Sequence, residues 1–167
     1  MPLVIFRQRA LDCIMSLKVN LRHLEAHELH LKGELPVEGL DFGLRDEMIE
    51  PKTPLCYDLR VERVAHSVLV QGKLTLTLHC QCVRCLKPFE KAIILDNWTL
   101  HLPLEGGDAV PVDNDCIDLT PYAREDMLLE FPQHPLCGPD CRGLGEIRRE
   151  NGQSGPSAWN ELDKLNF

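Results

Sequence analysis

Hydrophobic and polar residues alternate along much of the chain, at the period of two that is typical of half-buried β-strands. The alternation is strongest over residues 55–62 and 68–80, and it resumes over residues 89–103. Two further runs, over residues 15–22 and 29–35, show the same pattern. One antiparallel sheet with a single buried face explains all of these runs, because such sheets commonly keep their other face in water.

The regular alternation is interrupted at three places. It slips near Asp96-Asn97, which predicts a β-bulge or a turn. Residues 41–54 are acidic and contain two prolines, and we interpret them as a connecting loop with one helical turn. Residues 105–118 are rich in Gly, Pro and Asp, which predicts a mobile loop.

Helix signals follow the last of these loops. Thr120 offers a hydroxyl N-cap and Pro121 the first helical position, so we expect a helix to begin here and to end at Pro132. Ser157 is expected to cap a short final helix. The predicted fold class is α+β, a mostly antiparallel β-sheet with two short C-terminal helices.

The length of 167 residues suits one compact domain with appendages. We expect residues 1–14 to form an N-terminal extension, because the first alternating run begins at Met15. Residues 15–150 are expected to form the single α+β domain. Residues 151–167 are expected to be a linker followed by the final helix.

Charge and hydropathy narrow the classes of function. The net charge of −8 argues against a general nucleic-acid binder, because phosphate contacts need clustered Lys and Arg. Residues 105–130 hold eight acids and one base, and residues 28–50 hold seven acids and two bases. No run approaches the roughly 18 apolar residues that span a bilayer, and no secretory core is present. We therefore expect a cytoplasmic protein that engages no membrane and no small-molecule substrate.

Four of the eight cysteines form two close pairs. Cys82 and Cys85 are separated by two residues, and Cys137 and Cys141 by three. In a reducing compartment, pairs at this spacing more often bind metal or do redox chemistry than form disulfides. Two such pairs supply the four soft ligands of a closed tetrahedral site, so we predict a four-cysteine zinc-knuckle element that binds Zn2+.

The 51 residues between the two pairs do not exclude this site. Closing a loop of that size costs about 3–4 kcal/mol. Structural zinc contributes roughly 10–16 kcal/mol in small fingers at neutral pH, so binding outweighs closure if the sheet brings the pairs together.

Two other functions are compatible with the same cysteines. Cys82 and Cys85 have the spacing of a redox or metal-responsive thiol pair, although no thioredoxin-like βαβ pattern surrounds them. A zinc enzyme would need one thiolate to stay outside the coordination sphere and water to replace it. No Gly-rich phosphate loop, H-E-x-x-H or G-x-S-x-G motif is present, and we expect no enzymatic activity. His79 and His134 flank the pairs as reserve ligands.

Taken together, the motifs resemble those of the YceD-like family. Residues 82–89 resemble its C-x-R-C-L-x-P-F signature, and residues 135–144 resemble its P-L-C-x3-C-x-G-L element. Further matches are residues 117–121 with Arg124-Glu125 ahead of the helix, and Trp159 with Leu162 in the closing helix. Members often carry one more cysteine where this chain has Gly145, but the four paired cysteines still suffice for a site.

The resemblance implies a role in the accumulation of large-subunit ribosomal RNA without catalysis. Its implied partner is ribosomal RNA or a ribosome precursor, reached through a protein partner or a weak RNA contact. The candidate contact residues are the basic side chains around the two cysteine pairs: Arg84, Lys87, Lys91, Arg142, Arg148 and Arg149. Because Glu90, Glu146 and Glu150 are interleaved with them, a solvated rim is the competing interpretation.

Overall fold

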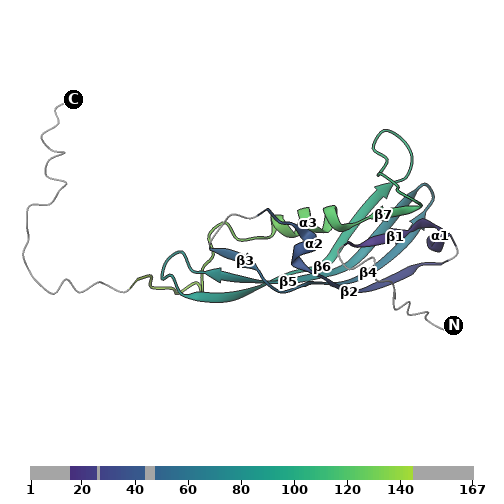
Figure 1. The fold of residues 1–167 in the computed structure, drawn as a ribbon. Helices are drawn as coiled ribbons and strands as arrows, with labels where there is room; N and C mark the ends of the chain where they lie inside the picture. The colour runs from purple at the N-terminus through teal and green to yellow at the C-terminus, as the bar shows by residue number, and fades with distance from the viewer. Residues whose placement is uncertain (1–15, 26, 44–47, 145–167) are drawn as a thin grey trace, which may run out of the picture.

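The computed structural model describes residues 16–25, 27–43 and 48–144 of the chain. A five-stranded antiparallel sheet runs the length of this part, and a small two-stranded sheet and helix α3 lie over one of its faces (Figure 1). The large sheet contains β2 (Leu29–Leu35), β3 (Ile49–Pro51), β4 (Leu55–Val64), β5 (Ser67–Gln81) and β6 (Pro88–Pro103). The small sheet contains β1 (Lys18–Asn20) and β7 (Cys116–Asp118), and the helices are α1 (Leu21–Leu24), α2 (Val37–Leu40) and α3 (Thr120–Leu129). The predicted fold class is confirmed.

Some expectations concern residues that the structure does not describe. The final helix, together with the extension 1–14 and the linker 151–156, lies outside the described residues. In the part of the chain that is described, no helix is long and apolar enough to cross a bilayer.

Strand β5 organises the large sheet. Its residues 67–75 pair with β4 and its residues 78–80 with β3, while β6 pairs along the whole of its other side. The 15 residues of β5 extend over about 50 Å, at about 3.3 Å per residue. The β5–β6 hairpin therefore continues past the end of β4 and carries its turn away from the centre of the molecule (Figure 1).

The buried face of the large sheet is the one that the alternation predicts. Val68, Val70, Leu74, Leu76 and Leu78 of β5 are each no more than 1% exposed. Residues of the small sheet and of α3 complete the same core, among them Val19, Ile117, Ala123 and Met127. Each such Val or Leu side chain stabilises the fold by roughly 1.5–3 kcal/mol when fully buried.

The predicted bulge in β6 is confirmed, and it keeps the strand's apolar residues on one face. Asp96 and Asn97 together lie opposite the single residue Lys73 of β5. Before the bulge the core face of β6 takes odd positions such as Ile93, and after it even positions such as Trp98. Without the extra residue, one of the two halves would turn its apolar side to water.

Gly72, beside this bulge, is required by a close approach of backbones. It lies opposite Leu59 of β4. A Cβ atom at Gly72 would lie 2.2 Å from the carbonyl oxygen of Asp58 and 2.8 Å from the Cα atom of Leu59. No side chain fits there unless one of the two strands moves.

Two of the predicted boundaries are wrong because side-chain hydrogen bonds differ from those that the sequence suggested. The strand expected over residues 15–22 ends at Asn20, whose side-chain oxygen accepts a hydrogen bond from the Arg22 N–H at 3.0 Å and opens α1. Thr120 is not the N-cap of α3, since Leu119 holds that position. The Thr120 hydroxyl instead accepts a hydrogen bond from the Leu17 N–H at 2.7 Å, which ties β1 to the helix.

Two strands occur where loops were expected. Within residues 41–54, Ile49–Pro51 forms β3 against Leu78–Cys80 of β5, and Pro51 ends it as prolines do on edge strands. At the end of residues 105–118, Cys116–Asp118 forms β7 against β1. Both strands have only three residues, so long-range pairing and not local alternation defines them.

Candidate metal centre at the end of the sheet

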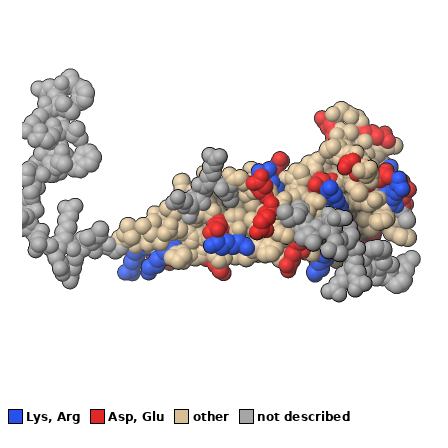
Figure 2. Space-filling view, viewed as in Figure 1, with Lys and Arg blue, Asp and Glu red and all other residues tan. Residues whose placement is uncertain are grey.

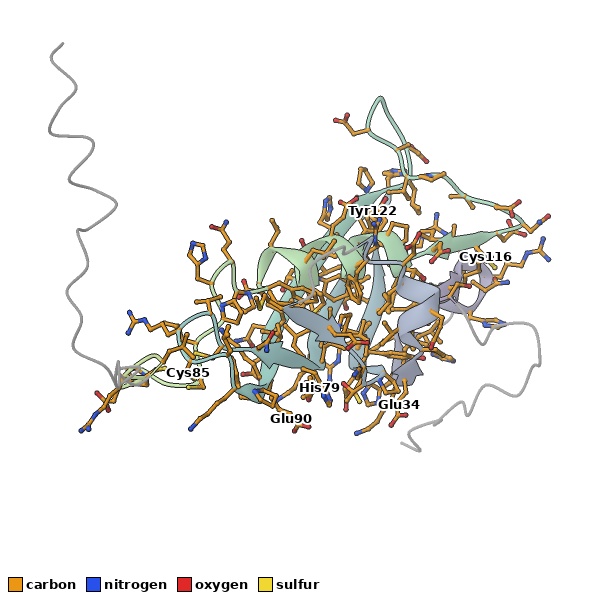
Figure 3. All side chains as sticks on the ribbon, turned by 60° about the vertical axis from the view of Figure 1, so that its left-hand side comes forward. Glu34, His79, Cys85, Glu90, Cys116 and Tyr122 are labelled. Atoms are coloured by element: carbon orange, nitrogen blue, oxygen red, sulfur yellow. The ribbon has the colours of Figure 1, made fainter. Side chains whose placement is uncertain are left out.

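The two cysteine pairs meet beyond the last pairs of the β5–β6 hairpin. The first pair lies in the turn between these strands, and the second lies in the chain that returns from α3 (Figure 1). Figure 3 shows Cys85 at this end of the sheet, far from Tyr122 on α3. Cys82 is buried but is not part of the main hydrophobic core, so the cysteines form a separate small cluster.

The turn of the first pair is fixed by its own backbone. The Leu86 N–H donates to the Cys82 carbonyl at 2.8 Å, and the Cys82 N–H donates to the Lys87 carbonyl at 3.0 Å. Leu86 has a positive φ of 59°, which lets the chain reverse after Cys85. The Gln81 side chain adds a hydrogen bond to the Leu86 carbonyl at 3.0 Å. Both thiols of the pair are thereby presented on the same side of the turn.

The second pair is attached to the first by backbone hydrogen bonds. The Val83 N–H donates to the Pro135 carbonyl, and the Leu144 N–H donates to the Arg84 carbonyl, both at 3.0 Å. Gly143 has a φ of 77°, and a Cβ there would lie 3.5 Å from the Arg84 carbonyl oxygen. The two segments are thus held together by backbone groups as well as by the cysteines, and the sequence did not predict these contacts.

The four sulfurs of Cys82, Cys85, Cys137 and Cys141 all lie within 4.8 Å of one another. Two separations join the pairs crosswise, with Cys82 Sγ 3.7 Å from Cys141 Sγ and Cys85 Sγ 3.7 Å from Cys137 Sγ. With Zn–S bonds of about 2.3 Å, the sulfurs of a tetrahedral site lie about 3.8 Å apart. All four cysteines are free thiols. Their number, chemistry and spacing therefore fit a tetrahedral thiolate metal site.

Two of the four thiols have shifted acidities. Hydrogen bonds from backbone groups, first of Cys137 and then of Cys85 and Arg84, lower the pKa of the Cys82 thiol to about 6 even though burial opposes this. Contact with the sulfurs of Cys85, Cys141 and Cys82 raises the pKa of the Cys137 thiol to about 12. A cluster of this kind resists full deprotonation until a cation lies among the sulfurs.

The other candidate ligands lie outside this cluster. His79 Nε2 is 3.5 Å from the Glu90 carboxylate, on the sheet face opposite α3 (Figure 3). Cys80 is buried in the main core, as its place in the alternation predicts, and Cys56 is exposed. In the described part of the chain, the four paired cysteines form the one group of His, Cys, Asp and Glu that could hold a metal ion.

Four of the six predicted contact residues surround the cluster, and we call Arg84, Lys87, Lys91 and Arg142 the basic tip. All are exposed except Lys91, which is half-buried. Figure 2 shows Lys and Arg side chains gathered at this end of the molecule. Among the residues that the structure describes, no ion pair involves these four side chains. Arg148 and Arg149 lie outside the described residues.

Comparison with protein families identifies the relationship that the motifs suggested. The family described as "Large ribosomal RNA subunit accumulation protein YceD" matches residues 70–166, which include all four cysteines. The chain belongs to this family. The predicted resemblance to YceD-like proteins is therefore confirmed, and the family's name connects it with accumulation of large-subunit ribosomal RNA.

Curated relatives of this YceD-family chain come from mycobacteria. The uncharacterized protein ML1660 of Mycobacterium leprae is 32% identical over 110 residues, which are 61% of this chain and 51% of that protein. The uncharacterized protein Rv2926c of Mycobacterium tuberculosis is 32% identical over 125 residues, which are 70% of this chain and 59% of that protein. The chain thus spans between half and three fifths of the length of these relatives. No solved structure matches it.

Proposed function

We propose that this chain is a non-enzymatic, zinc-binding factor that acts in the accumulation of large-subunit ribosomal RNA or in assembly of the large ribosomal subunit. The observation that carries the proposal is the convergence of four free thiols from two distant segments within 4.8 Å. The family name supplies the connection with ribosomal RNA.

Zinc is the metal that the donor set favours. Four thiolates in tetrahedral spacing are typical of Zn2+ or of iron–sulfur clusters, and knuckles of this kind commonly hold a single zinc ion. A site with four protein ligands has no open position for water or substrate, so its role is to hold the two segments together. This supports a binding module in place of a zinc enzyme.

A thiol redox or metal-responsive protein is the second candidate. The lowered pKa of the Cys82 thiol favours it, because a low pKa is typical of reactive cysteines. Two observations weigh against it: Cys82 is fully buried, and its sulfur lies 3.7 Å from that of Cys141, in the other pair.

The partner we propose is ribosomal RNA or a ribosome precursor in the cytoplasm, reached largely through a protein. The net charge of −8 repels a polyanion at long range, so nonspecific affinity for RNA is expected to be poor. The basic tip offers about three or four phosphate contacts, for a log–log salt slope of about −3 on duplex-like RNA. Specificity must then come from protein contacts or from an assembled particle.

Metal content and native co-purification test the two halves of the proposal separately. Freshly purified protein should hold one zinc per chain, and Cys137→Ser should lose it without losing the sheet. Zinc that stays substoichiometric after reloading would contradict the metal site. A Cys82–Cys85 disulfide in protein purified without reductant would favour the redox candidate.

The basic tip is tested by charge reversal. The Arg84→Glu/Lys87→Glu variant should associate less with large-subunit precursor particles, because it removes two of the few cations that can meet phosphate. The matched control is Arg22→Glu/Lys18→Glu, which makes the same charge change on the small sheet and α1. Sedimentation of tagged protein with precursor particles measures the effect; equal association by both variants would move the contact surface elsewhere.

A further inference from the structure

A groove between β6 and α3 is a hollow that the proposed function leaves unused. It has a volume of about 500 Å3 and is lined by Ile94–Thr99 of β6 and by Asp126, Leu129 and Glu130 at the end of α3. We call these residues the edge groove. It is separate from the cysteine cluster and from the basic tip, since they share no residue.

The floor of the edge groove is the free edge of a strand. Six consecutive residues of β6 line it, although successive side chains of a strand point to opposite faces of the sheet. A hollow that meets both sets follows the edge between the two faces. Strand β6 pairs with β5 on one side, and no strand of the described ranges pairs with its other side. The Asn97 carbonyl accepts a hydrogen bond from the Thr99 hydroxyl at 3.3 Å, but the other outward backbone groups of this stretch have no strand partner in the described ranges and can pair with an added strand.

Apolar side chains stand at the groove where a partner would need anchors. Leu129 is 82% exposed and Ile94 is 49% exposed, so the apolar surface of both side chains is open to a partner. Leu129 belongs to α3, and Ile94 belongs to β6 at a position that faces away from the core, so the two side chains border the strand edge from different elements. A segment lying in the groove would cover both.

The charge of the groove selects one class of occupant. Asp96, Asp126 and Glu130 line it, and no Lys, Arg or His does. Asp96 is paired with Lys73 at 2.6 Å, and Asp126 accepts a hydrogen bond from the Trp98 indole at 2.6 Å, so both carboxylates are held in place. Such a surface repels nucleic acid and attracts cationic peptide.

We propose that the edge groove binds an extended, Lys- or Arg-rich segment of a protein partner, which adds a strand to β6 and places apolar side chains against Leu129 and Ile94. This deepens the proposed function, on which it rests for the kind of partner, by giving the protein-mediated contact a surface. The bulge at Asp96-Asn97 interrupts the ladder of β6, so pairing is confined to short stretches, and indiscriminate edge-to-edge association is prevented.

A synthetic peptide tests the groove without any ribosomal component. The probe alternates Lys and Val over about eight residues, enough to cover the lined part of β6 at about 3.3 Å per residue. Its ends are blocked, and binding to the full chain is measured by calorimetry. A Glu-for-Lys peptide tests charge, and a peptide with proline at every second position tests the backbone ladder. The Lys peptide should bind, and both control peptides should bind at least about tenfold more weakly.

Variants locate the binding. Leu129→Ser/Glu130→Lys should weaken binding of the Lys peptide about tenfold or more, because it removes an apolar anchor and reverses a charge of the groove. Glu125→Lys is the matched control, since it makes the same charge change at an exposed position of α3 outside the groove. Circular dichroism checks that both variants keep the fold.

Several outcomes would overturn the inference. These are equal binding of the Lys and Glu peptides, equal loss of binding in Glu125→Lys, or binding of single-stranded RNA that Leu129→Ser/Glu130→Lys abolishes. Light scattering that shows a dimer lost in the same variant would make a second copy the occupant. Tighter peptide binding by Trp159→Ala/Leu162→Ala would make residues of this chain's own C-terminal segment the occupant. If the Lys peptide binds but the chain does not associate with ribosomal particles, this inference is supported and the proposed function is contradicted.

Discussion

Gly72 allows β5 to pair with β4 on one side and with β6 on the other at the same position. On the side of β4, the backbones of the two strands come so close that a Cβ atom at this position would lie 2.2 Å from the Asp58 carbonyl oxygen. On the side of β6, Gly72 lies opposite Trp98, beside the bulge. Because the blocking atoms belong to the backbone, no rotamer change relieves the clash. The indole of Trp98 is 5% exposed and depends on the position of β5 at this point.

We expect Gly72→Ala to lower the free energy of unfolding by about 3 kcal/mol, the upper end of what overpacking costs. Urea unfolding followed by Trp fluorescence measures it. Gly107→Ala is the control, because nothing lies within 4 Å of a Cβ there, and it should change the free energy of unfolding by less than about 1 kcal/mol. Equal stability of the two variants would mean that β4 and β5 can separate at little cost.

At the scale of single elements, the strands that could be predicted are those whose side chains alternate over many residues. Strands β4 and β5 are of this kind, and even the bulge of β6 was visible as a slip in the alternation. Strands β3 and β7 could not be predicted, because three residues carry too little pattern and their pairing depends on segments far away in the chain. The edge groove is out of reach for the same reason, since it depends on which strand is left without a neighbour.

The candidate metal centre was more predictable than most elements. Cysteine spacing named the four side chains, because a knuckle is a local turn whose geometry is set within a few residues. Their role as ligands stays a prediction. The hydrogen bond from the Val83 N–H to the Pro135 carbonyl could not be predicted, because a bond between backbone groups does not depend on the residue types.

The knuckle turn also predicts how metal retention depends on pH. Backbone hydrogen bonds lower the pKa of the Cys82 thiol from 9.0 to about 6, so the fold favours its thiolate. That preference is fully present above about pH 9 and is lost as pH falls through about 6, where the thiol is protonated. We therefore expect zinc to be held at pH 7 and released progressively below about pH 6.

A colorimetric chelator added across a pH series measures the release. Cys56→Ser is the control, because Cys56 lies outside the cluster and its loss should leave the release curve unchanged. Zinc retained at pH 4, or already lost at pH 8, would contradict the assignment of Cys82 as a ligand.

At the scale of the whole molecule, the metal centre and the main core are two separate packing units. The core lies between the large sheet, the small sheet and α3, whereas the four cysteines cluster beyond Gln81, outside the part of β5 that pairs with β4. The core contains long apolar faces of its own, so it need not depend on the ion as a minimal zinc finger does.

Removal of zinc by a chelator should therefore loosen the end of the hairpin and leave the sheet folded. Hydrogen exchange should quicken over residues 82–88 and 135–144 and stay slow over residues 55–78. Far-ultraviolet circular dichroism of the same samples should change little. Loss of the strand signal on chelation would show that the core depends on the metal.

The hydrogen bonds and sulfurs that join the two segments also determine how the molecule carries mechanical load. From Cys85, in the turn of the hairpin, the chain forms β6, β7 and α3 and returns to the same place at Cys137, so those three elements lie within a ring that the cysteine pairs close. Tension applied beyond Leu144 meets the Leu144–Arg84 and Val83–Pro135 hydrogen bonds first, and the metal–sulfur bonds when zinc is bound. The force then passes through these bonds and not through β6, β7 and α3, so α3 stays packed on the sheet when a partner pulls on the C-terminal end.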